Sequence, residues 1–131
     1  MKHKKIKKQK RLIHTHIVFK DEHGDALCNA LLFMLGCGDF NFQSEKICAA
    51  CADTAQEKLC ERDVTLTPGE LKASAKAITF ALSCLSEDMS KYLFMEDDFP
   101  GLLSDLKNSL PFLEEMEPHF QSMVSDLRKM Q

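Results

Sequence analysis

The amino-acid sequence predicts a mainly α protein, in which four to five helices form a small bundle with a short β element near the N-terminus. The chain has 131 residues and a hydrophobic content of 44%, which suffice for one domain with its own core. Apolar residues recur at helical spacing along most of the sequence. They alternate with polar residues only near its start, which is typical of a strand.

The first 11 residues, MKHKKIKKQKR, carry seven lysine or arginine side chains and no acidic one. Only Met1 and Ile6 are apolar, so this segment has too little hydrophobic surface to join a core. We therefore expect residues 1–11 to form a flexible basic arm and residues 12–131 to form a single small α-rich domain.

Residues 12–20, LIHTHIVFK, are predicted to form a strand, because their apolar and β-branched residues alternate between two faces. Residues 63–66 are predicted to form a second short strand that can pair with the first. Residues 21–25, DEHGD, are expected to make a turn in which Gly24 takes a positive φ. One side of the first strand is expected to carry Ile13, Thr15, Ile17 and Phe19, and the other side His14, His16 and Val18.

Two helices are expected between these strands. Asp25 is a suitable N-cap for a helix over residues 26–35, and Gly36 stands where a helix-terminating glycine belongs. Residues 37–43 are expected to form a loop. Ser44 is a suitable N-cap for the second helix, which would continue to about Cys60.

The strongest local signal is the sequence Thr67-Pro68-Gly69-Glu70. Threonine at the N-cap, proline at the first helical position and glutamate at the third form a capping box, so a helix is expected to about Leu85. Two further helices are predicted near residues 99–109 and 110–130, with Pro118 kinking or splitting the last one. Their apolar stripe would consist of Leu102, Leu106, Leu110, Leu113, Phe120, Val124 and Leu127.

Six cysteines raise the question of a metal or redox site, and three of them lie in the stretch SEKICAACADTAQEKLC. On one continuous helix, Cys48 and Cys51 share a face and Cys60 points the opposite way. Alanine spacers favour a helix, so the favoured interpretation is small apolar side chains buried in a packed helix, with no metal. Two alternatives stay open: a redox C-x-x-C pair, which would want a preceding strand, and a zinc site built on Cys37, Cys48, Cys51 and His16.

Motifs of the common catalytic sites are missing from the sequence. It contains no nucleophile elbow, no phosphate-binding glycine loop and no H-E-x-x-H motif. Acid pairs such as Glu87-Asp88 are adjacent, so on a helix they do not face each other across a cleft. We therefore expect a protein that is not an enzyme, without catalytic residues and without a cofactor.

Charge is strongly segregated along the chain. Residues 1–20 hold eight basic and no acidic side chains, whereas residues 21–131 hold nine basic against twenty acidic ones, a balance of −11. The arm is a candidate for binding polyanions such as nucleic acid, and the acidic segment is a candidate for binding a basic partner. The arm residues are Lys2, Lys4, Lys5, Lys7, Lys8, Lys10 and Arg11, and the acidic ones are Glu87, Asp88, Glu96, Asp97 and Asp98.

The expected location is the cytoplasm, with the cysteines as thiols and no membrane partner. No apolar run approaches the roughly 20 residues that a membrane-spanning helix needs. A basic start before an apolar run loosely resembles a lipoprotein signal, but Asp21, Glu22 and Asp25 directly precede that run and Asn29 interrupts it.

Size and charge together favour a small non-enzymatic binding or regulatory protein that acts on nucleic-acid machinery or a nucleoprotein complex. Some phage-encoded inhibitors of nucleic-acid-binding enzymes share this composition. A protein partner is expected, and nucleic acid is a further candidate through the arm. The alternative is a self-assembling helical protein whose Leu/Met/Phe-rich tail pairs with a copy of itself. The weaker alternative is the zinc-binding module described above.

Overall fold

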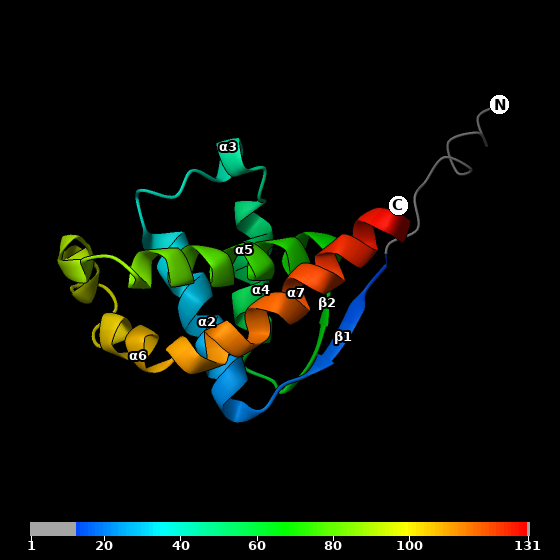
Figure 1. Cartoon of the computed structure of the whole chain (residues 1–131), viewed down its shortest axis with the longest axis horizontal. Coiled ribbons are helices and arrows are strands. Elements are labelled where there is room, and N and C mark those ends of the chain that lie inside the picture. The colour runs from blue at the N-terminus through cyan, green and yellow to red at the C-terminus, as the bar shows by residue number, and fades with distance from the viewer. Residues whose placement is uncertain (1–12, 131) are drawn as a thin grey trace.

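A computed structural model describes residues 13–130 of the chain, and the basic arm lies outside these residues. The described part is mostly helical, with a small two-stranded sheet (Figure 1), which confirms the mainly α prediction. The predicted number of four to five helices is not matched, because residues 13–130 contain six α-helices and a 3-10 helix. The elements are β1 (Thr15–Val18), α2 (Asp21–Gly36), α3 (Phe42–Glu45), α4 (Ala49–Lys58), β2 (Asp63–Leu66), α5 (Pro68–Leu85), η1 (Met89–Glu96), α6 (Leu102–Asn108) and α7 (Leu110–Met130).

The two predicted strands pair as expected. β1 and β2 are antiparallel, with Thr15 opposite Leu66 and Val18 opposite Asp63. Residues 13–19 alternate between partly or fully buried and exposed positions, as the period of two predicted. The inward face of this ribbon therefore covers one end of the helical core, and its outward face leaves His16 beside Asp63.

The expected turn at residues 21–25 is wrong, because these residues form the first turn of α2. Acidic residues at 21 and 22 favour a helix N-terminus, and the amide of Gly24 donates to the carbonyl of Lys20 at 2.9 Å. Gly24 is buried inside the helix against Phe19 and has no positive φ. Gly36 is the last residue of α2 and is followed by extended backbone at Cys37 (φ −89°).

The predicted single helix over residues 44–60 is also wrong. Asn41 caps the short α3, its side-chain oxygen accepting from the amide of Ser44 at 2.9 Å. Lys46 then takes a left-handed conformation (φ 59°), and its amide donates to carbonyls within α3. This conformation ends the helix, so the chain restarts at Cys48, which is the N-cap of α4.

α5 forms the centre of the fold and contacts α2, α4 and α7 (Figure 1). The stripe predicted for the C-terminal helices is buried in this core, except for the half-buried Leu110. α7 continues without interruption through the exposed Pro118, so the expected split does not occur. Packing against α5 on both sides of the proline holds the helix together, through the buried side chains of Leu113, Met116, Phe120, Val124 and Leu127.

The predicted capping box at the start of α5 is present. The hydroxyl of Thr67 accepts from the amide of Glu70 at 3.2 Å, and the carboxylate of Glu70 accepts from the amide of Thr67 at 2.8 Å. Both bonds satisfy amides that have no partner within the helix.

Replacing Thr67 by alanine should lower the free energy of unfolding by about 1 kcal/mol, because the amide of Glu70 then loses its acceptor. The measurement is the urea midpoint of the variant against that of the wild type. An unchanged midpoint would show that this hydroxyl contributes nothing to the helix start.

Candidate functional site

The acidic residues predicted to bind a basic partner lie on η1 and its flanks, between α5 and α6. Figure 1 places η1 and α6 at the end of the molecule opposite to β1 and β2. Asp97 and Asp98 are exposed, and within residues 13–130 neither takes part in an ion pair. These two carboxylates therefore add negative charge to the surface around η1 that no ion pair within residues 13–130 offsets.

Two other carboxylates of this set have local partners. The side chain of Asp88 caps η1 by accepting from the amide of Ser90 at 2.9 Å. Glu96 accepts from the amides of Gly101 at 2.8 Å and Leu103 at 3.0 Å, which lowers its pKa. The Glu96 carboxylate is hydrogen-bonded to the backbone at the start of α6, so these bonds compete with binding to a partner.

Two apolar side chains are exposed on the same 3-10 helix. Leu93 is 60% exposed and Phe94 is 56% exposed, both on η1. Leu93 also lines a cavity of about 480 Å³ between η1 and α6, together with Met89 and Leu103. These two residues were not predicted from the sequence, because a 3-10 helix has no apolar periodicity comparable to that of an α-helix.

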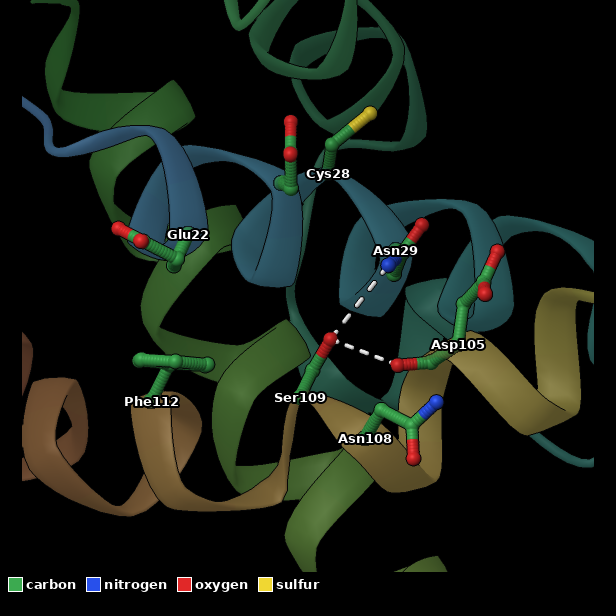
Figure 2. A pocket seen from close by; sticks show the side chains of 8 residues that line it. Glu22, Cys28, Asn29, Asp105, Asn108, Ser109 and Phe112 are labelled. Atoms are coloured by element: carbon green, nitrogen blue, oxygen red, sulfur yellow. Dashed lines mark hydrogen bonds between the residues drawn. The ribbon is translucent and has the colours of Figure 1, made fainter.

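A second cavity, of about 410 Å³, lies between α2 and the junction of α6 with α7 (Figure 2). Its walls are polar: Asn29 donates to the hydroxyl of Ser109 at 3.5 Å, and that hydroxyl donates to the carbonyl of Asp105 at 2.8 Å. The lining contains carboxylates and no basic side chain. Carboxylates at this mouth would favour a cationic group over an anionic one.

A basic pocket of about 380 Å³ is formed where α5 and α7 meet the segment between α3 and α4. Four cations line it, against the single acid Glu45, whose carboxylate pairs with Lys76 at 3.1 Å. This pocket was not predicted from the sequence, because its cations come from segments far apart along an acidic chain. The cations are Lys46, Lys72, Lys76 and Arg128.

The residues of the zinc alternative are not brought together. Cys37 is buried after α2, Cys48 and Cys51 lie at the start of α4, and His16 lies on the exposed face of β1 beside Asp63. Within residues 13–130 no group of three or more potential ligands is close enough to hold a metal ion.

The interpretation of the C-A-A-C stretch as buried helix residues is wrong. Cys48 and Cys60 are exposed, and Cys51 is half-buried; the buried cysteines are Cys37 and Cys84. The reason is the break at residue 46, which moves Cys48 from the middle of a helix to its N-cap.

Among the described residues, no helix is both long enough and apolar enough to cross a membrane. Comparison with protein-family models, with curated proteins and with solved structures finds no match for this chain.

Proposed function

We propose that this protein is a small non-enzymatic regulatory protein that binds a basic partner within nucleic-acid machinery. The surface around η1 binds a basic, amphipathic segment of that partner. The arm, residues 1–11, adds contacts to phosphate groups. Cytoplasmic location is part of the same proposal.

The observation that carries the proposal is the pair of exposed apolar side chains, Leu93 and Phe94, next to the carboxylates of Asp97 and Asp98. An aromatic side chain surrounded by charge is typical of the centre of a protein interface. Exposed apolar surface is unfavourable in water, and a partner that covers it gains the hydrophobic free energy. The carboxylates select a partner of positive charge and speed its association.

The position of η1 relative to the first described strand supports a protein with two contacts. η1 lies at one end of the fold, and β1, which follows the arm in sequence, lies at the other (Figure 1). A nucleoprotein complex offers both kinds of partner, because it exposes basic protein segments and phosphate groups.

The self-assembly alternative has less support. Self-assembly was predicted from the apolar side chains of the C-terminal helices. In α7 these side chains are buried, and α7 packs against α5 of the same chain. The sedimentation experiment below tests whether two copies pair through Phe94.

Reversing two carboxylates should separate the two contacts. The variant Asp97→Lys/Asp98→Lys should bind a basic amphipathic peptide at least about fivefold more weakly than the wild type, with a smaller dependence on salt. Its binding to duplex DNA should not weaken. Deletion of residues 1–11 should do the opposite, weakening the duplex and sparing the peptide. Fluorescence anisotropy across a salt series measures both affinities.

The matched control is Asp53→Lys/Glu57→Lys, which makes the same change in net charge on exposed positions of α4. Equal loss of peptide binding in both variants would show that only net charge matters and would contradict the proposed surface. Sedimentation of the wild type and Phe94→Ser tests the alternative: a dimer that the substitution dissociates would assign this patch to a second copy.

A further inference from the structure

The two cysteines of the C-A-A-C stretch lie at the first turn of α4, a helix of ten residues. Cys48 is the N-cap, and its sulfur accepts from the amide of Cys51 at 3.3 Å. A helix N-terminus concentrates positive partial charge from its amide groups, which stabilises a thiolate at this position. The side chain of Cys48 is exposed, so a reactant can approach its sulfur from solvent.

Cys51 differs from Cys48 in its surroundings. Its sulfur packs against the backbone of Gly69, where an added Cβ would lie only 2.7 Å from the Cys51 Sγ. The Glu70 carboxylate is close enough to disfavour a negative charge on Cys51. The pair therefore consists of one accessible sulfur and one protected sulfur.

Hydrogen bonding and burial shift the pKa values of the two thiols in opposite directions. A hydrogen bond from the Cys51 thiol, with that from the Cys51 amide, lowers the pKa of Cys48. Burial, followed by the hydrogen bond to Cys48 and the charges of Cys48 and Glu70, raises the pKa of Cys51 to about 11. This difference assigns the roles in thiol–disulfide exchange, because the thiol with the larger thiolate fraction and the better access attacks first.

The basic pocket is lined by close neighbours of this pair, although neither cysteine lines it. Ile47, directly before Cys48, lines the pocket, and so does Lys72, which lies on the same turn of α5 as Gly69. Of the four cations, only Lys76 takes part in an ion pair within residues 13–130. A negatively charged group is therefore attracted to the space next to the exposed sulfur.

We propose that Cys48 and Cys51 form a dithiol–disulfide pair that exchanges with anionic disulfides, with Cys48 as the attacking thiol and Cys51 as the resolving thiol. This inference is independent of the proposed partner surface on η1. A redox C-x-x-C pair was expected to follow a strand, and the sequence predicts no strand before C-A-A-C. The observed chain has no strand there either, but the left-handed residue Lys46 restarts the helix and places Cys48 at its N-cap.

The exchange needs no oxidant other than the disulfide itself. The Cys48 thiolate attacks one sulfur of the disulfide RSSR. A bond forms between Cys48 Sγ and that sulfur, the S–S bond of RSSR breaks, and RS⁻ leaves and takes a proton from solvent. Cys51 then gives up its proton and attacks the Cys48 sulfur, which releases the second RS⁻. The protein loses two electrons to RSSR and gains an internal disulfide, while two RSH molecules form.

The test uses the full-length reduced protein and oxidised glutathione, a disulfide that carries carboxylates. Peptide mass spectrometry should find a Cys48–Cys51 disulfide in the product. Cys51→Ser should stop at a mixed disulfide on Cys48, and Cys48→Ser should lower the rate of the first step by roughly tenfold, because it removes the favoured thiolate. Cys60→Ser, at another exposed cysteine, is the matched control and should react like the wild type.

Substrate charge is tested with cystamine, a disulfide that carries amines in place of carboxylates. The wild type should react faster with oxidised glutathione than with cystamine, and Lys72→Gln/Arg128→Gln should bring the two rates together. Equal rates in the wild type would overturn the assignment to anionic disulfides. A product that pairs other cysteines, or a Cys48 that reacts no faster than Cys60, would overturn the dithiol pair itself.

Discussion

Replacing Phe33 by alanine should lower the free energy of unfolding by about 3–5 kcal/mol. Phe33 lies in the last turn of α2 and is 0% exposed. Its ring lies 5.6 Å from the centroid of Phe80 on α5 and 5.1 Å from that of Tyr92 on η1. The substitution removes a buried aromatic side chain and leaves a cavity between three elements, which the fixed helices cannot fill.

Phe94→Ala is the matched control, because it removes the same ring from an exposed position two residues after Tyr92. We expect its effect on stability to stay within about 0.5 kcal/mol. Urea denaturation of both variants makes the comparison. Similar losses in both would contradict the described packing of η1 against α2.

Replacing Glu70 by alanine should lower the free energy of unfolding by about 2–3 kcal/mol, because it leaves several polar groups without a partner. Glu70 is only 4% exposed. Its carboxylate accepts from Lys58 Nζ at 2.6 Å, from Thr54 Oγ1 at 2.7 Å and from the amide of Thr67 at 2.8 Å. These bonds join α4 to the start of α5, so the loss should exceed that of Thr67→Ala.

The pH dependence of stability gives a second measurement on Glu70. Burial raises the pKa of this carboxyl, but hydrogen bonds from Lys58, Thr67 and Thr54, with the charge of Lys58, lower it below its ordinary value of 4.5. A depressed pKa in the folded state contributes stability above pH 4.5, and this contribution is lost as the pH falls through the folded pKa. Glu70→Gln should therefore destabilise the protein at neutral pH, with a difference from the wild type that shrinks in acid. A difference independent of pH would contradict the ionised pair.

Features that depend on neighbours along the chain could be predicted from the sequence. The alternation of residues 13–19 identified β1 and its buried face, because side chains of a strand alternate strictly between its two sides. Thr67, Pro68 and Glu70 identified the start of α5, because a capping box is complete within four residues. The apolar spacing of residues 110–130 identified the face that α7 buries.

The composition of the candidate sites could not be predicted from the sequence, because it depends on how the helices pack. The left-handed conformation of Lys46 turned Cys48 from a helix-interior residue into an exposed N-cap. The amides of Gly101 and Leu103 donate hydrogen bonds to Glu96, which was predicted from its charge to bind a partner. α5 and α7 brought Lys72 beside Arg128 in a pocket that no local pattern marks. Side chains distant in sequence meet only when helices pack, so their charge and reactivity follow from neighbours that the local sequence does not contain.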